Sequence, residues 1–362
     1  MNIILIRVIK PLLKLLLILL SIFLVSNLGF AFDALAHDRV KVTLLPGATG
    51  AEVVERNQGT RLISEEPDVI IGFPEEKESE YISLLQNDKQ VDLTFRVYTL
   101  PRLNVDQYLV ALKHCAEMYT SGTFGEISFR NGFVFKTVPI TEHLSEMAFR
   151  SFSYLIPGLL VGVTSGIALA LLAVWKPRIG RVLDISNRLL LSVPDFLMIV
   201  LIQYAAIAID RRMNSTVIVV MQYQDQIPFL IPMLGISVLP GALIYGALRI
   251  AFEREWREGY IKTAYSKGLS RSLVISRHMF RNTVEDLLTI LPRAVSVAIA
   301  SMVVAEVMTM IFGIGGYPFA QSVTAVSSLA TTCAILAIFT LLTNGLISYL
   351  RNRQVVQKRR GS

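Results

Sequence analysis

The sequence is poor in charge, cysteine and histidine, and it lacks the motifs of several enzyme classes. Charged residues make up 17% of the 362 residues and hydrophobic ones 53%, whereas about a quarter of a soluble domain is charged. There is no G-x-x-x-x-G-K-[ST] phosphate loop, no H-E-x-x-H and no G-x-S-x-G, so nothing supports P-loop ATP hydrolysis or hydrolase chemistry. The four histidines and two cysteines form no cluster with metal-ligand spacing. We therefore expect no catalytic residue, no metal site and no cofactor bound by this chain.

Positive charge is distributed unevenly along the chain. The formal net charge is +7, but residues 33–149 hold 11 Lys and Arg against 18 Asp and Glu. The remainder holds 24 against 10, mainly between or beside apolar runs. This pattern is typical of the positive cytoplasmic face of a membrane protein and does not indicate a phosphate-binding surface. We expect membrane lipid around the chain and no nucleic acid.

Six apolar runs are long enough to cross a bilayer, which takes about 20 mostly apolar residues. They are 11–32, 151–175, 189–209, 228–252, 287–312 and 328–350. The third run contains Asp195, and an acid at the centre of a span costs about 2.5–3.5 kcal/mol on insertion scales. We expect Asp195 to lie toward one end of its span or to face protein. The predicted fold class is an all-α polytopic membrane protein with about six transmembrane helices.

The basic residues of the short loops predict the orientation. Six spans place both termini on one side together with loops 176–188 and 253–286, and these four segments, with Lys14 near the start of the first run, carry 19 Lys and Arg. The short loops of the opposite side carry only two, Arg211 and Arg212. The positive-inside rule therefore places both termini in the cytoplasm.

Residues 33–149 form the one sizeable polar segment, and this topology exports them. The segments 39–45 and 91–98 have the patterns of strands, and the apolar spacing of 105–119 predicts an amphipathic helix. We expect a small α+β extracytoplasmic domain inserted between the first and second spans. The alternative is that the first run is a signal peptide cleaved after Ala34-Leu35-Ala36, although the run exceeds the usual length of about 7–15 apolar residues.

The loop 253–286, which we call the elbow, is long, highly charged and free of proline. Its spacing predicts a helix over 255–265 and a second helix over 271–282. Between them we expect a turn, because Gly268 suits a positive φ at a helix C-terminus and Ser270 suits the N-cap of the next helix. Such a helix–turn–helix projection is shaped for a groove of another protein. An ordinary connector between two spans is the alternative.

The elbow also carries an ordered motif. It reads R-E-G-Y-I-K-T-A-Y-S-K-G-L-S over 257–270, with R-H at 277–278 and R-N at 281–282. This motif closely resembles the cytoplasmic EAA loop of dipeptide/oligopeptide ABC-transporter permeases, which reads roughly R-E-D-Y-[IV]-R-T-A-R-A-K-G-L-S, then R-H-x-x-R-N. Three further segments are similar to motifs of that family: Gly-Thr-Phe-Gly at 122–125, Ser-Val-Pro at 192–194, and Glu306 followed by Phe-Gly-Ile-Gly-Gly at 312–316. The resemblance covers the first span and about 105–350.

The resemblance implies the fold of a type I ABC importer permease, with the elbow coupled to an ATPase. The residues assigned to coupling are Glu258, Tyr260, Ala264, Lys267, Gly268, Leu269, Ser270, Arg277, His278 and Asn282. Those assigned to the translocation path or to structure are Asp195, Glu306, Gly315 and Gly316. The implied parts are the N-terminus and first span (1–32), the extracytoplasmic domain (33–149), a five-helix permease core (150–350) and a basic cytoplasmic tail (351–362).

The resemblance further implies partners and a location in the bacterial cell membrane. A second, homologous permease completes a heterodimer or a homodimer, two ATPase subunits hold ATP and Mg, and an extracytoplasmic solute-binding protein delivers a peptide or similar small solute. Relatives of this type also handle nickel and other chelates.

Two departures from the family pattern stand out. Glu285-Asp286 occupy the place of Ile-Pro, and Asp195 follows Ser-Val-Pro where a neutral residue is usual. Two alternatives also stay open at this point. One is a membrane-anchored receptor that senses a ligand with residues 33–149. The other is an ion-coupled secondary transporter, which would use intramembrane charges such as Asp195, Arg293 and Glu306.

Overall fold

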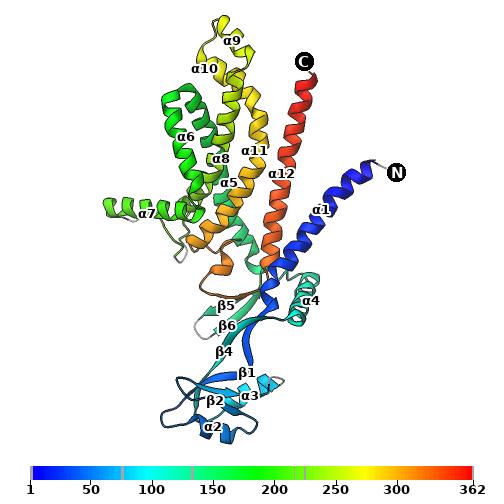
Figure 1. Cartoon of the computed structure of the whole chain (residues 1–362), viewed down its shortest axis with the longest axis vertical. Helices are drawn as coiled ribbons and strands as arrows, with labels where there is room; N and C mark the ends of the chain where they lie inside the picture. The colour runs from blue at the N-terminus through cyan, green and yellow to red at the C-terminus, as the bar shows by residue number, and fades with distance from the viewer. Residues whose placement is uncertain (1–2, 75–76, 132–133, 216, 224–225, 361–362) are drawn as a thin grey trace. The chain divides into compact units, whose positions relative to one another are not determined.

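The structure is a computed structural model of the chain, and it describes residues 3–74, 77–131, 134–215, 217–223 and 226–360. Its elements are labelled in Figure 1. The chain divides into two compact units. One is formed by residues 24–114, and the other by residues 1–23 together with 115–362.

Residues 24–114 form an α+β unit around a four-stranded sheet of order β2-β3-β1-β4, in which every neighbouring pair is antiparallel. In chain order its elements are η1 (Leu28–Ala31), β1 (Phe32–Leu44), α2 (Gly50–Arg56), β2 (Arg61–Ser64), β3 (Val69–Gly72), α3 (Glu78–Gln86), β4 (Val91–Leu103) and the first part of α4 (Val105–Ser121). Side chains alternate along a strand, so Val40 and Val42 of β1 share one face. There they are buried with Val53 of α2 and Leu85 of α3, which form the core of this unit.

The two strands and the helix expected in this segment are present within β1, β4 and α4. The compact unit ends at His114, however, and not at residue 149. The reason is that β5 (Glu126–Asn131) pairs with β6 (Val134–Pro139) and with β7 (Val323–Val326), strands that belong to the other unit.

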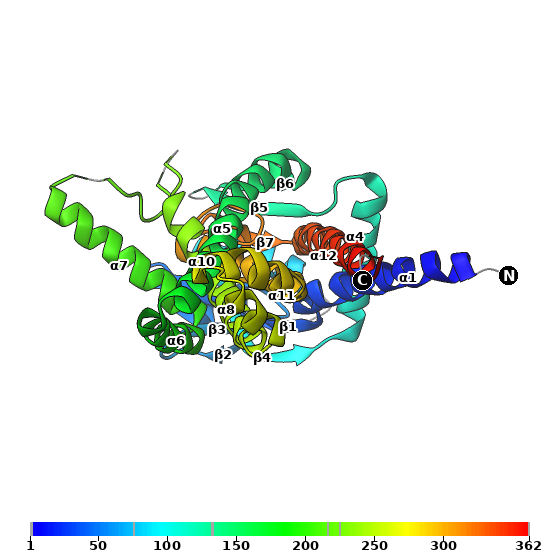
Figure 2. The same ribbon diagram turned by 90° about the horizontal axis from the view of Figure 1, so that it is seen from above.

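The larger unit is mostly helical. Besides β5, β6 and β7 its elements are α1 (Ile3–Ser26), α5 (Thr141–Trp175), α6 (Pro177–Ser192), α7 (Asp195–Met213), α8 (Leu230–Trp256), α9 (Gly259–Ser266), α10 (Arg271–Leu273), the π-helical η3 (Val274–Met279), α11 (Phe280–Met308), η4 (Tyr317–Phe319) and α12 (Leu329–Arg360). Figures 1 and 2 show α5, α8 and α11 side by side, with α7 projecting from them.

Glycines bring α5 and α8 into backbone contact. Gly158, Gly162 and Gly166 recur every four residues on one face of α5. A Cβ atom at these positions would lie 2.8, 2.7 and 2.6 Å from the carbonyl oxygens of Met233, Ser237 and Gly241, respectively, on α8. Small residues at a helix interface are how membrane helices approach closely without a hydrophobic driving force.

Four or five of the six expected spans are supported by the structure. Among the described residues, four helices are long and apolar enough to cross a bilayer, and a fifth span results if the bent pair α6 and α7 counts as one. The four are Thr141–Trp175, Leu230–Trp256, Arg271–Met308 and Leu329–Arg353. The helix at the first predicted span, 11–32, is displaced toward the N-terminus: α1 begins at Ile3 and ends at Ser26, and β1 begins at Phe32.

The predicted span 189–209 is interrupted by a bend of 111° between α6 and α7. Val193 and Pro194 leave the helical region, with φ/ψ of −90°/131° and −61°/146°. Proline has no N–H to continue the hydrogen bonding of α6, and it disfavours helical angles in the residue before it. Residues 189–192 therefore end α6, and Asp195 begins a new helix.

Candidate functional site

The turn of the elbow has the geometry that its glycine predicts. Gly268 has φ +77°. Its N–H donates to the Tyr265 carbonyl at 2.9 Å, and the Leu269 N–H donates to the Ala264 carbonyl at 3.2 Å, which closes α9 as a Schellman motif. The Ser270 side chain then accepts from the Leu273 N–H at 3.4 Å and caps the next helix. The predicted turn at 267–270 is confirmed.

The helices on either side of the turn differ from the prediction in their bounds. The helix expected over 255–265 is divided, because α8 continues to Trp256 and the extended Glu258 (ψ 144°) separates it from α9. Gly259, a weak helix former, opens α9. The second helix does not end at residue 282, since α10, η3 and α11 run on as one helix of 38 residues over Arg271–Met308.

The apolar side of the elbow packs against the rest of the unit. Ile261 and Ala264 of α9 are buried with Phe252 of α8 and with Val274 and Met279 of η3. Ala264 therefore faces its own chain. Its small size is required by internal packing, and an Ala264→Trp variant would disrupt the elbow itself rather than a partner contact.

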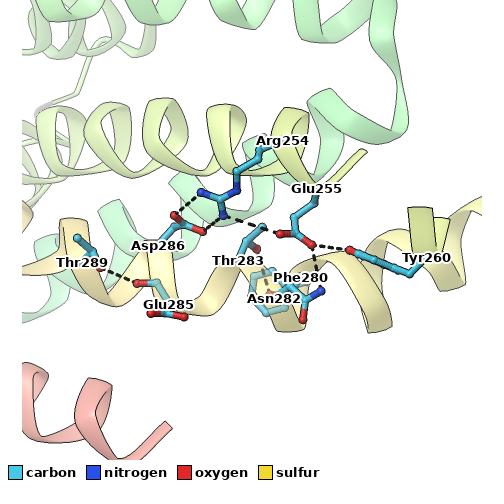
Figure 3. A network of polar contacts seen from close by, with 9 residues as sticks. All are labelled: Arg254, Glu255, Tyr260, Phe280, Asn282, Thr283, Glu285, Asp286 and Thr289. Atoms are coloured by element: carbon cyan, nitrogen blue, oxygen red, sulfur yellow. Dashed lines mark hydrogen bonds and ion pairs between the residues drawn. The ribbon is translucent and has the colours of Figure 1, made fainter. Parts of the chain in front are cut away.

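A polar network fixes the elbow to the helices below it (Figure 3). The Glu255 carboxylate, only 9% exposed, accepts from the Tyr260 hydroxyl at 2.6 Å and from the Asn282 side chain at 3.0 Å. Burial and the hydrogen bond to Glu255 raise the pKa of Tyr260 to about 12, so this hydroxyl keeps its proton and donates at neutral pH. Beside this network, Arg254 of α8 donates to both carboxylate oxygens of Asp286 on α11, at 3.3 and 2.7 Å.

This network explains one departure from the family pattern. Asp286 stands where the pattern has a proline, and it forms an ion pair that joins α8 to α11. Glu255 was expected to be helical, but nothing in the sequence marked it as the acceptor that joins α8, α9 and α11. A glutamate in a charged loop does not stand out, because carboxylates are common there.

Five of the ten residues assigned to coupling line one groove on the elbow. The full lining is Tyr260, Leu269, Leu273, Arg277, His278, Arg281 and Asn282. The other five lie elsewhere on the elbow. Glu258, Lys267, Gly268 and Ser270 are exposed, and Ala264 is buried.

The four residues assigned to the path or to structure fall into two places. Glu306, near the end of α11, is completely buried and accepts from the Gly315 and Gly316 N–H groups, each at 2.7 Å. It also accepts from the Ser151 hydroxyl at 2.5 Å and from the Tyr154 hydroxyl of α5. The carboxylate therefore holds the loop after α11 against α5. Ser151 and Tyr154 lie about 150 residues away in the chain, so no local pattern of residues indicated this pairing.

Asp195 lies at the other place. It is half-buried in the first turn of α7 and accepts from the Ser301 hydroxyl of α11 at 2.9 Å. The N-terminus of a helix stabilises a negative charge, and the hydrogen bond adds to this. Asp195 thus begins its helix and faces protein, as expected for an acid beside apolar residues.

Comparison with known proteins agrees with these features. Residues 158–361 match the family described as "Binding-protein-dependent transport system inner membrane component". The chain is 28% identical over 178 residues to the dipeptide transport system permease protein DppB of Bacillus subtilis, covering 48% of this chain and 55% of that protein. It is 26% identical over 212 residues to the probable peptide ABC transporter permease protein y4tP of Sinorhizobium fredii, covering 57% and 66%. The chain thus matches less than two thirds of the length of either relative.

Among solved structures, a chain of the MetNI methionine ABC transporter in an inward-facing conformation aligns with 60% of this chain and 97% of its own length. The sequence identity is 12% and the TM-score 0.46.

Proposed function

Because the chain belongs to the family of binding-protein-dependent transport system inner membrane components, we propose that it forms the translocation path of an ABC importer and couples to ATPase subunits through the elbow. The resemblance to permeases of peptide-type ABC importers, drawn from the elbow motif, is confirmed by this membership and by the two relatives. Members of the family are membrane transport subunits, and the several apolar helices of this chain agree with that role.

The geometry of the elbow is the observation that carries the coupling role. Its turn is closed by a Schellman motif, its apolar side is buried in the unit, and Glu255 ties α9 to α11. The elbow is therefore a fixed projection that can transmit a push from a partner into α8 and α11. ATP-driven closure of two ATPases would move it and switch the spans between inward and outward access.

The other partners follow from the same proposal. A second, homologous permease forms the other wall of the path, as a heterodimer or homodimer. An extracytoplasmic binding protein delivers the solute, and ATP and Mg bind to the ATPases. Both termini and the elbow lie in the cytoplasm, and the unit 24–114 lies outside. The names of the two relatives favour a peptide as the solute.

The hydrogen bonds of the two intramembrane acids favour this importer over a secondary transporter. Asp195 is engaged by Ser301, and Glu306 holds the loop after α11. An ion-coupled transporter would need such groups for ion or proton binding.

Substitution of Gly268 tests the coupling role. The left-handed conformation costs a side-chain-bearing residue about 1–2 kcal/mol, and more for a β-branched one, whereas asparagine adopts it readily. No atom lies within 4 Å of a Cβ built at Gly268, so Gly268→Val strains the turn without a steric clash. We expect Gly268→Val to reduce ATPase co-purification about tenfold, since 1.4 kcal/mol is a factor of ten, and to reduce uptake. Gly268→Asn should retain both.

Arg254→Ala is the matched control on the same loop. The side chains of Arg254 and Asp286 are 57% and 30% exposed, and an ion pair of this kind contributes under about 1 kcal/mol. Normal ATPase retention and uptake by well-expressed Gly268→Val protein would refute the coupling role and leave the elbow as a connector.

A further inference from the structure

The groove of the elbow is lined by two arginines and a histidine that form no ion pair with the described part of the chain. Arg277, His278 and Arg281 are exposed on this groove. Among the residues that the structure describes, none of the three forms an ion pair or a side-chain hydrogen bond. Half-buried Tyr260 and Asn282, with Leu269 and Leu273, complete the lining.

Two acidic residues of the elbow network are already engaged within the chain. Glu255 accepts from Tyr260 and Asn282, and Asp286 is paired with Arg254. Arg277 and Arg281 are four residues apart on one helix, a spacing at which like charges destabilise the helix. The cluster of positive charge therefore does not stabilise the elbow, and an anion from outside the chain would relieve it.

The anion could be a lipid phosphate or a carboxylate of a partner protein. The distance of the two arginines from the membrane distinguishes these two sources. The apolar end of the helix, residues 287–308, spans roughly 33 Å at 1.5 Å per residue and by itself fills the hydrocarbon layer of about 30 Å. Arg281 and Arg277 precede Leu287 by six and ten residues, or roughly 9 and 15 Å. The headgroup layer adds only about 5–8 Å on each side. Along a helix perpendicular to the membrane, the Cα atom of Arg277 thus lies beyond the headgroup layer, which favours a protein carboxylate as its counter-charge.

We propose that the groove seats an acidic segment of the ATPase partner, with a carboxylate between Arg277 and Arg281 and apolar side chains against Leu269 and Leu273. This inference rests on the proposed ATPase coupling and adds the chemistry of the docked surface. Guanidinium groups suit it because they bind carboxylates through two parallel hydrogen bonds.

A zero-length carbodiimide cross-link in the purified complex with the ATPase tests the contact. The reagent joins amines to carboxylates and does not react with arginine, so Arg277→Lys introduces a reactive amine into the groove while keeping its charge. We expect a new cross-link from position 277 to an Asp or Glu of the ATPase, mapped by mass spectrometry. Lys262, exposed on α9 and outside the groove lining, is the internal control and should give no cross-link to that acid.

Charge reversal supplies a second measurement. Arg277→Glu and Arg281→Glu should each weaken ATPase retention at least about tenfold, because loss of a paired interface charge typically costs more than 1.4 kcal/mol. Lys262→Glu changes the net charge of the elbow equally and should leave retention within about twofold.

The outcomes separate this inference from the coupling role. If wild-type protein retains the ATPase and Gly268→Val loses it, while the two arginine reversals behave like the Lys262 reversal and no cross-link forms at 277, coupling stands and the acidic-segment inference is refuted. If the arginine reversals reduce only the binding of vesicles containing anionic lipid, a lipid phosphate occupies the groove and the inference is also refuted. If the wild-type chain retains no ATPase, the coupling role itself fails.

Discussion

Replacing Glu306 by alanine removes the acceptor of four donors in a completely buried site. A buried donor left without a partner costs about 1–3 kcal/mol. The hydroxyls of Ser151 and Tyr154 can rotate toward other acceptors, but the N–H groups of Gly315 and Gly316 are fixed by the backbone. The two N–H groups alone therefore predict a loss of about 2–6 kcal/mol in the free energy of unfolding for Glu306→Ala.

Glu306→Gln is the matched comparison. Its amide oxygen can accept from Gly315 and Gly316, while its NH₂ group donates to the Ser151 and Tyr154 oxygens, since a hydroxyl both donates and accepts. We expect Glu306→Gln to lose only about 1–2 kcal/mol, for the exchange of charge-assisted hydrogen bonds for neutral ones.

Thermal unfolding of the two purified variants in detergent, with limited proteolysis of the loop 309–328, measures the difference. Glu306→Ala should unfold well below wild type and expose the loop to protease, and Glu306→Gln should stay close to wild type and support uptake. An alanine variant as stable as wild type would refute the structural role. A stable glutamine variant without uptake would assign the carboxylate to the path instead.

Two further expectations concern the orientation and the packing of α5. In a background without Cys115 and Cys333, a membrane-impermeant maleimide should label Glu80→Cys in intact cells and Glu258→Cys only after permeabilisation. Both positions are exposed. The opposite labelling would reverse the topology. Gly162→Ala should lower the thermal stability, because its Cβ would lie 2.7 Å from the Ser237 carbonyl oxygen. Gly345→Ala on α12 is the control, since its Cβ meets no atom within 4 Å, and it should be neutral or slightly stabilising. Equal effects of the two substitutions would contradict the close contact of α5 with α8.

Local features of the elbow could be predicted because they depend on a few neighbouring residues. A left-handed turn favours glycine, so Gly268 and the cap at Ser270 could be located from their order alone. The bounds of the helices could not. The continuation of the second helix through residue 282 depends on its packing with α8, and neither Asn282 nor Thr283 is a helix breaker that would mark an end.

The bend before α7 is marked in the sequence by a proline, but the apolar length of the run around it favoured an unbroken helix. Pro194 lies inside the run 189–209, and proline is a helix breaker. The pairing of Glu306 with α5 and that of Glu255 with α11 had no local signal. Their partners, Ser151 on α5 and Asn282 on α11, become neighbours only when the helices pack.

The unbroken helix over Arg271–Met308 has a mechanical consequence. It carries the groove residues near its first turns and Glu306 in its last turn. At 1.5 Å per residue its 38 residues make a stiff lever about 57 Å long. A tilt of about 5° at the elbow would displace the opposite end by about 5 Å, less whatever flexing occurs at Pro292, where one backbone hydrogen bond is missing. Glu306 accepts hydrogen bonds from the backbone N–H groups of Gly315 and Gly316, so the loop that contains them would move together with the end of the helix. In the proposed importer, this movement would open or close the far side of the path.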